Sequence, residues 1–504
     1  MWFVQHKTTH CSIIPKFHYS IARYRTKETI TANRSLVLRP RRNRIGSLET
    51  PAKKSPFKIR NIRLFIAFRV FFNCRFYYPV FTILFLDYGL SLEQFALLNA
   101  TWAATIVLLE VPSGALADTV GRRNLLVFTG ILMVIEMILL CFAPRGNAQL
   151  LFPIFLVNRI LSGAAEASAS GADEAIAYDS LLAEGDIRDW PRVLEKQMWA
   201  RSVAFIIAMS LGAAVYDPDL MQRVADSIGI NVTLNQGITL RIPPLLTLLM
   251  AFLTLITALR MRESGHHNNQ KNAARGLSIA GAFKLTLTAG GWILRTPFAS
   301  VIILAGVVFD NCIRMIITLN SQYYRLIDLP EATFGLIGSG LAILGLVMPR
   351  VARGMVQKHT PAFNLGVMSG LTMIGLVGIT FFWPIIGLLP LIILVAVIYL
   401  ENFFQSHYLN RITDSQQRAT VLSFKGLSFN LAYGLIGLLY SLLLAYLSLQ
   451  ARTGRPEISN VQLENLVFIK SIAWFPGYFL LTMLAVLVFA RWRLKNTDEH
   501  KRPG

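Results

Sequence analysis

Apolar stretches long enough to cross a bilayer recur along the chain and are separated by short polar breaks. A membrane-spanning helix needs about 20 residues, and twelve stretches of that kind are present. They cover residues 64–86, 94–117, 124–143, 150–176, 198–216, 242–261, 298–320, 333–352, 363–383, 385–408, 420–447 and 468–490. This pattern predicts an all-α membrane protein with twelve transmembrane helices, and an even number places both termini on one side of the membrane.

Composition supports the same class of protein. Of the 504 residues, 54% are hydrophobic and 15% are charged, whereas soluble domains carry about a quarter charged residues. The balance argues against a soluble enzyme, a disordered chain and a disulfide scaffold. The four cysteines lie far apart and show no metal-ligand spacing, so we expect neither a metal nor a cofactor.

Positive charge is concentrated near the N-terminus. The formal net charge is +21, and residues 1–63 hold 15 Lys and Arg against Glu28 and Glu49 alone. We interpret this segment as a basic cytoplasmic tail; an organellar transit peptide and an over-extended gene start are the alternatives. No nucleic-acid motif accompanies the charge, so we expect no nucleic-acid partner.

The distribution of Lys and Arg between the loops predicts the orientation. Counted over the loops and the turns that flank the stretches, the side that holds the termini carries 38 of them and the opposite side carries 7, and the remaining 4 lie deep within the stretches. Both termini should therefore be cytoplasmic. We expect a multi-pass protein of the cell membrane, or of an organellar membrane if residues 1–63 are a transit peptide.

The longest internal connection divides the apolar stretches into two groups of six. It opens with a polar run and continues with a semi-apolar stretch, residues 276–296, which predicts an interfacial helix; an ordinary amphipathic loop helix is the alternative. The predicted units are a tail over residues 1–63, a six-helix bundle over 64–261, a linker over 262–297, a second bundle over 298–490 and a basic tail over 491–504.

The short loop between the second and third stretches carries a motif. It reads Gly114-Ala-Leu-Ala-Asp118-Thr-Val-Gly121-Arg122-Arg123. Gly114 permits close helix contact, and Gly121 permits a tight turn. Asp118 is suited to a helix N-terminus or an Arg partner, and the two arginines anchor the cytoplasmic surface.

This motif resembles the signature loop of the major facilitator superfamily, and the twelve stretches with a central linker agree with it. The resemblance covers about residues 60–495. It implies two six-helix bundles around a central site, without cofactor or metal. It also implies a conformational latch, in which the loop Asp contacts the start of the eleventh span and charges on the fourth. The latch group here is Gly114, Asp118, Gly121, Arg122, Arg123 and Asp173.

Two further segments resemble a branch of the superfamily that is grouped with drug:proton antiporters. Arg159-Ile-Leu-Ser-Gly163 matches an element whose Arg is linked to proton coupling, and residues 170–181 and 418–423 resemble that branch. The Gly-Pro element of drug antiporters is absent, because Ala213 stands where Pro is expected. Uptake therefore stays open beside efflux.

Nine ionisable residues lie well within the apolar stretches, where each costs about 2.5–3.5 kcal/mol at a helix centre and should face a partner or a cavity. They are Arg69, Arg75, Glu110, Glu136, Arg159, Glu166, Asp310, Arg314 and Glu401. Seven of the nine fall on the first, fourth, seventh and tenth spans, the helices that line the central cavity in the superfamily.

Spacing suggests how these residues interact. Arg159, Glu166 and Asp173 are seven residues apart, which predicts one shared helix face, and Asp310 and Arg314 are an i,i+4 pair. Proton coupling needs a carboxyl that can gain and lose a proton. Glu166 is the first candidate, followed by Asp310 and Glu401, and the remaining cavity residues are Arg75, Arg159 and Arg314.

These observations predict secondary active transport of a small solute by alternating access, coupled to protons and carried out by a monomer in the lipid bilayer. Efflux of amphipathic compounds and uptake of a nutrient are both compatible with the sequence. The chain has no phosphate-binding loop and no hydrolase or metalloprotease motif, so we expect it not to be an enzyme. A non-transporting sensor or enzyme on the same fold is the competing class.

Overall fold

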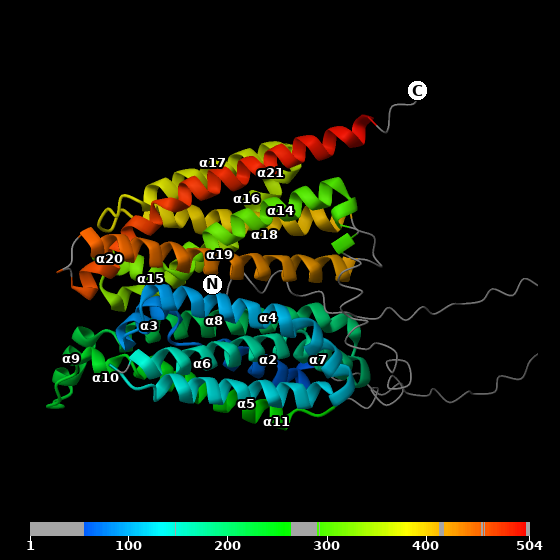
Figure 1. Cartoon of the computed structure of the whole chain (residues 1–504). Coiled ribbons are helices and arrows are strands. Elements are labelled where there is room, and N and C mark those ends of the chain that lie inside the picture. Colours follow the sequence, from blue (N-terminus) through cyan, green and yellow to red (C-terminus); the bar gives the residue numbers. More distant parts are fainter. Residues whose placement is uncertain are drawn as a thin grey trace, which may run out of the picture.

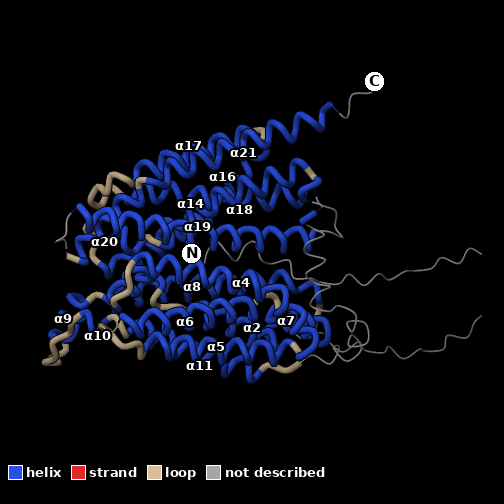
Figure 2. Tube along the Cα trace, viewed as in Figure 1, coloured by secondary structure: helices blue, strands red, loops and turns tan. Residues whose placement is uncertain are grey.

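The computed structural model describes residues 55–146, 148–263, 290–291, 293–412, 418–454, 457 and 459–499. Over these ranges the chain is helical, with short connections and no strand (Figure 2). The all-α prediction is confirmed. The tail up to residue 54 and most of the linker, including residues 276–289 of the predicted interfacial helix, lie outside the described residues.

The first half of the chain, up to residue 260, contains ten described α-helices. They are α2 (Arg60–Asn73), α3 (Phe81–Tyr88), α4 (Leu92–Val120), α5 (Arg122–Cys141), α6 (Ala148–Ala169), α7 (Ala172–Glu184), α8 (Trp190–Tyr216), α9 (Pro218–Ser227), α10 (Gln236–Thr239) and α11 (Ile242–Arg260).

The second half repeats this arrangement of long helices. Its described helices are α14 (Pro297–Thr318), α15 (Asn320–Leu326), α16 (Phe334–Lys358), α17 (Pro361–Ile379), α18 (Leu388–Ile412), α19 (Arg418–Gly454), α20 (Asn460–Ile472) and α21 (Trp474–Glu499).

Eleven helical segments of the described chain are long and apolar enough to cross a membrane, one fewer than the sequence predicts. The missing one is the first, which is broken in the middle. Its helices α2 and α3 are separated by residues 74–80, where a short 3-10 turn contains Pro79. A proline removes a backbone donor and clashes with the preceding turn, so it interrupts a regular helix.

Neighbouring helices accommodate this break. The backbone N–H of Phe76 donates a 3.0 Å hydrogen bond to the Thr247 hydroxyl on α11, which satisfies a backbone group that the break frees in the membrane. Gly212 on α8 approaches the carbonyl of Phe76 so closely that a Cβ there would lie 1.8 Å from its oxygen. The break therefore depends on a glycine of another helix.

The helices form two layers. In Figure 1 the helices from residue 297 onward lie above those up to residue 260. The layers meet where α19 packs along α4 and where α16 packs along α8. Small residues allow this approach: a Cβ on Gly335 would lie 2.0 Å from the carbonyl oxygen of Met209, and one on Gly437 would lie 3.2 Å from the Cβ of Ala100.

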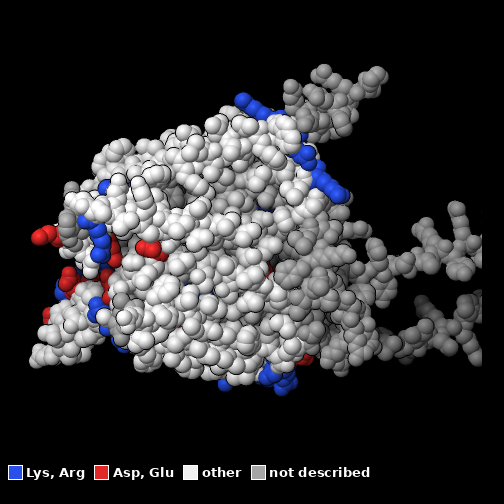
Figure 3. All heavy atoms as spheres, in the orientation of Figure 1, with Lys and Arg blue, Asp and Glu red and all other residues white. Residues whose placement is uncertain are grey.

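The bundle has two ends, which we call the α9 end and the tail end. At the α9 end lie α3, α9, α10 and α15, and at the tail end lie the first residues of α2 and the last of α21 (Figure 1). On the face shown in Figure 3, charged side chains gather at these ends and the belt between them is uncharged. Large apolar side chains such as Leu346 and Leu481, each 70% exposed, point outward from the helices, as expected where lipid is the solvent.

Candidate functional site

The break in the first span places Arg75 inside the first half. Its guanidinium contacts the Glu136 carboxylate on α5 at 2.8 Å and donates a 3.2 Å hydrogen bond to the Tyr77 hydroxyl. Arg75 is 2% exposed and Glu136 is fully buried. The two charges therefore neutralise each other in the membrane interior, where either alone would be costly.

Arg159 on α6 has a different environment. Its guanidinium lies over the rings of Phe81 and Trp102, at 5.3 and 5.4 Å from their centroids. The Arg159 guanidinium also donates a 3.3 Å hydrogen bond to the side-chain oxygen of Asn99 on α4. Arg159 is 4% exposed, and its Nε has no hydrogen-bond partner. No carboxylate of the described chain forms an ion pair with it.

Glu166 lies on the same helix but is not paired with Arg159. The charges that act most strongly on its carboxyl are those of Arg75 and Arg69, and Glu110 on α4 lies close enough to feel its charge. Glu166 therefore lies in the electrostatic environment of Arg75 and Arg69.

The predicted stripe of three charges on one helix is wrong at its last member. The helix is interrupted after α6, and Gly171 has a φ of +78° before α7 begins. This left-handed conformation, which favours glycine, reorients the chain, so that Asp173 binds the Arg69 guanidinium on α2 with a 2.9 Å hydrogen bond. Asp173 thus ties α7 to α2.

The second half holds the predicted i,i+4 ion pair. The Arg314 guanidinium contacts the Asp310 carboxylate at 2.6 Å, and it donates a 3.2 Å hydrogen bond to the side chain of Asn430 on α19. Arg314 also lies over the ring of Tyr433, 5.1 Å from its centroid. All four residues are buried.

A second charged pair lies beside this one. Glu401 on α18 and Lys425 on α19 are 2% and 1% exposed, and Lys425 is the cation whose charge acts most strongly on Glu401. Neither carboxylate oxygen of Glu401 has a hydrogen-bond partner. The carboxylate and the Gln405 amide lie over Gly306 of α14, where a Cβ would lie 2.8 Å from Oε1 of Glu401.

Lys425 is the residue that sequence reasoning missed. It lies near the start of a predicted span, so it was counted among the cations that flank the loop after the tenth span. The helix α19 begins at Arg418 and carries Lys425 two turns inward, where its ammonium lies over the Phe429 ring at 4.8 Å.

The signature loop forms contacts at the tail end. Gly121 has a φ of +99°, which supports its predicted role in a tight turn. Arg122 forms an ion pair with Asp179 of α7, and the Arg123 guanidinium donates to the carbonyls of Leu259 and Met261 at 3.0 and 2.9 Å. Gly114 and Asp118 lie on α4, but the surroundings of Gly114 and the side chain of Asp118 are not among the parts that the structure describes, so the latch stays a prediction.

Glu263 completes this corner, and the sequence did not single it out. Its carboxylate accepts hydrogen bonds from the backbone N–H groups of Arg122 and Arg123, at 3.2 and 3.0 Å. These groups belong to the first turn of α5, where a negative charge is favourable. Glu263 thereby fixes the chain that follows α11 to the start of α5.

The α9 end is closed by contacts between the two halves. Arg325 on α15 donates hydrogen bonds of 2.9 and 2.7 Å to the two oxygens of Asp87 at the end of α3. Glu331 accepts from the same guanidinium, and the Tyr216 hydroxyl donates to Asp87. Burial lowers the pKa of Arg325, but the carboxylates of Asp87 and Glu331 raise it by more, so its net pKa lies above the usual value.

Further contacts between the halves lie next to this ion pair. The backbone N–H of Thr82 donates a 3.0 Å hydrogen bond to the Ser321 hydroxyl, and the Thr82 hydroxyl donates to the carbonyl of Thr318 at 2.6 Å. The Ser441 hydroxyl donates to the carbonyl of Glu93 at 3.2 Å. These hydrogen bonds, like the Arg325–Asp87 pair, join the two halves at the α9 end.

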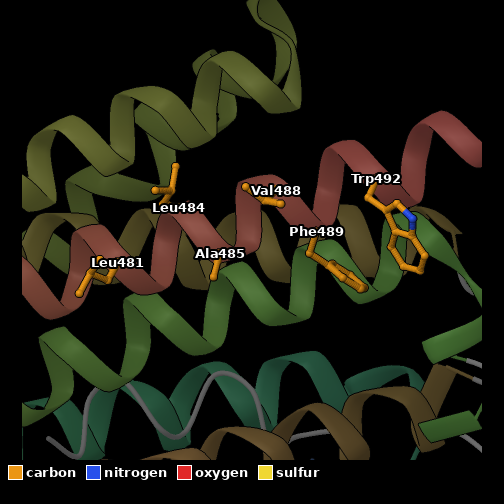
Figure 4. A pocket seen from close by; sticks show the side chains of 6 residues that line it. All are labelled: Leu481, Leu484, Ala485, Val488, Phe489 and Trp492. Carbon is orange, nitrogen blue, oxygen red and sulfur yellow. The ribbon is translucent and has the colours of Figure 1, made fainter.

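A groove on the outside of the bundle has a different character. It runs along α21 (Figure 4) and is lined by Leu481, Leu484, Ala485, Val488, Phe489 and Trp492. These side chains are apolar and lie on the outward face of the helix, so lipid chains suit the groove better than a polar solute does. Within the described chain, no three or more His, Cys, Asp or Glu side chains are arranged to hold a metal ion.

Buried charges inside each half, together with exposed apolar residues on long helices, indicate a membrane protein. Comparison with known proteins gives the family: a sequence model of the major facilitator superfamily matches residues 63–406. The chain belongs to this superfamily. It is a multi-pass membrane protein whose function is secondary transport. No curated protein sequence matches the chain.

Solved transporters share the fold. A bacterial homolog of the human lysosomal transporter Spinster, inward-facing and unoccupied, has a TM-score of 0.64 at 14% identity, over 88% of this chain and 99% of that one. The nucleoside transporter NupG has a TM-score of 0.57 at 12% identity, over 86% and 98%. A D-xylose–proton symporter has a TM-score of 0.54 at 15% identity, over 83% and 97%.

Proposed function

We propose that the protein couples solute transport to protons through the buried charges of its second half. Glu401 is the carboxyl that carries the proton. The observation that carries this proposal is that neither oxygen of its buried carboxylate accepts a hydrogen bond. A carboxylate without a donor is costly in a medium of low dielectric constant, whereas the neutral acid is much less so.

The groups that face Glu401 give the proton exchange a physical basis. Lys425 comes from α19, and Asp310 and Arg314 come from α14. Asp310 already has Arg314 as its partner at 2.6 Å. A movement of α19 relative to α14 and α18 would bring Lys425 toward Glu401 or away from it, and would thereby favour the ionised or the neutral carboxyl.

Glu166, which the sequence places first among the candidate proton carriers, is the second candidate in this proposal. It lies among Arg75, Arg69, Glu110 and Glu136, so its charge can be balanced by nearby cations. Because neither carboxylate oxygen of the buried Glu401 accepts a hydrogen bond, we place Glu401 first and Glu166 second.

We further propose alternating access across the interface of α4 with α19 and α8 with α16. The contacts of Asp87 and Thr82 with the second half support a conformation closed at the α9 end. If the termini are cytoplasmic, as the loop charges predict, this is an inward-facing conformation of a cell-membrane protein. A solute that moves inward or outward with protons suits this arrangement, and efflux in the manner of drug:proton antiporters is one such mode.

The experiment uses sealed proteoliposomes that contain the pH-sensitive dye pyranine. A panel of amphipathic solutes is added outside, and proton movement is recorded for the native chain, Glu401→Gln and the control Glu195→Gln. Glu195 is an exposed carboxylate of α8. We expect solute-dependent proton movement in the native chain and the control, and none with Glu401→Gln. Equal proton movement in all three would show that Glu401 does not carry the proton.

A further inference from the structure

We propose that Arg159 binds the anionic group of the transported solute, so that the substrates are small organic anions with an apolar body. The inference rests on the transport function proposed above and names the chemical class of its substrate.

Four arginines of these spans are buried, and three of them have a carboxylate partner. Arg69 binds Asp173, Arg75 binds Glu136 and Arg314 binds Asp310. Arg159 is as deeply buried, at 4% exposure, but has only the neutral amide of Asn99. A cation of a membrane helix normally pairs or faces a site, because an unpaired charge there is unfavourable. The missing partner of Arg159 is an anion.

The geometry leaves the edge of the guanidinium for that anion. The ring contacts of Phe81 and Trp102 occupy positions over the group, where aromatic faces attract a cation. A guanidinium carries five N–H donors arranged to bind a carboxylate through two parallel hydrogen bonds. Asn99 accepts one of these hydrogen bonds, and Nε has no partner.

The surroundings favour an apolar body on the anion. Tyr77, Tyr78 and Phe81 pack against one another beside Arg159, with ring centroids 5.2 to 6.2 Å apart. Tyr433 of the second half lies near enough for its phenol to feel the charges of both Arg159 and Arg314. A solute held by Arg159 would therefore touch aromatic rings and reach the interface between the halves.

The test measures binding to the purified full-length chain in nanodiscs by titration calorimetry. The probes are two matched pairs, benzoate with benzamide and indole-3-acetate with indole-3-acetamide, in which each amide keeps the shape and lacks the charge. We expect the native chain to bind a carboxylate at least tenfold more tightly than its amide. Arg159→Gln should remove this preference, and Arg188→Gln, at an exposed arginine paired with Asp186, should keep it.

A second variant, Asn99→Asp, distinguishes loss of the anion site from loss of folding, either of which could explain weaker binding by Arg159→Gln. Asn99→Asp places a carboxylate beside Arg159 and supplies the missing partner from within the protein. It gives up the hydrogen bond from the Asn99 amide to the Phe95 carbonyl but gains an ion pair. We expect an unchanged or raised Tm together with carboxylate binding at least tenfold weaker than in the native chain.

The outcomes separate this inference from the proposed function. Failure of the native chain to prefer carboxylates to amides, or unchanged carboxylate binding in Asn99→Asp, would overturn the inference. Proton-driven transport of the amides alone would do the same and leave proton coupling in place. Carboxylate binding that depends on Arg159, without any solute-dependent proton movement, would support the inference and contradict the coupling.

Discussion

Arg325 of α15 binds both carboxylate oxygens of Asp87 at the end of α3, at 2.9 and 2.7 Å. The two residues are 238 positions apart and belong to different halves of the protein. Because guanidinium and carboxylate match in this geometry, the pair fixes the two halves against each other at the α9 end.

Loss of this pair should loosen the α9 end. Arg325→Gln leaves Asp87 and Glu331 as neighbouring carboxylates without their shared cation, and we expect a loss of stability of about 1–2 kcal/mol. We also expect faster alkylation of a cysteine placed at Ser441, on the interface of α19 with α4. Both are measured on the purified chain with Cys11 replaced by Ser.

Arg188→Gln is the control for this measurement, because its pair with Asp186 is exposed and lies within one half. It should change neither quantity. If Arg325→Gln labels no faster than the control, the pair does not hold the α9 end closed.

Gly212 offers a test of the broken first span. In Gly212→Ala the new Cβ would lie 1.8 Å from the carbonyl oxygen of Phe76, so α8 or the break must move. We expect a destabilisation of about 1–3 kcal/mol, the usual effect of overpacking, measured by thermal unfolding in detergent.

Gly366→Ala is the matched control, since no atom lies within 4 Å of a Cβ at that helical position. Alanine favours a helix by about 0.5–1 kcal/mol over glycine, so the control should be as stable as the native chain or more so. Equal stability of the two variants would mean that α8 does not approach the break as described.

The loop charges predict the orientation of the chain, which a pair of reporters can test. A reporter fused after Gly504 should be active only in a cytoplasmic form. An epitope inserted at Gly229, which has open space around it between α9 and α10, should bind antibody on intact cells. Accessibility of the C-terminal reporter from outside, with the Gly229 epitope protected, would reverse the orientation.

The latch predicted at Asp118 is tested through transport. Asp118→Asn keeps the size of the side chain and removes its charge. We expect normal membrane insertion and at least tenfold slower transport, which corresponds to a barrier change of about 1.4 kcal/mol. Asp219→Asn, in the first turn of α9 at the opposite end, should transport normally. Normal rates in both variants would limit the loop to a role in topology.

The lengths of the apolar stretches predicted most of the fold, because a helix that crosses a membrane needs about 20 apolar residues. Eleven of the twelve predicted spans have a long helix in the structure. The exception is the first span, which is long enough to cross the membrane and in which Pro79 is the sequence feature that suggests a break. The local sequence could not show that Thr247 and Gly212, from two other helices, contact the backbone at the break.

Pairing between buried charges was harder to predict than their presence. The i,i+4 relation of Asp310 and Arg314 was readable because both lie on one helix. The partners Arg75 and Glu136 come from different helices, and Gly171 redirected Asp173 toward Arg69. Such contacts depend on tertiary packing, which the spacing along one helix does not contain.

Lys425 and Arg325 show that charges counted as loop or flanking residues can also have partners on other helices. Both were counted as loop or flanking cations that set topology. In the structure, Lys425 is buried beside Glu401, and Arg325 joins the halves. A count of charges by position along the chain cannot distinguish a cation that faces water from one that has a partner on another helix.

The central claim is that Glu401 couples the transport cycle to protons. The most direct measurement compares two activities of Glu401→Gln in sealed vesicles, with a radiolabelled solute that produces proton movement in the native chain: accumulation of this solute driven by a pH gradient, and its exchange at equal concentrations and equal pH. Glutamine imitates the neutral carboxyl, so the variant should lose accumulation and retain exchange, because exchange needs no net proton movement. Accumulation by Glu401→Gln at the level of the native chain and of Glu195→Gln would contradict the claim.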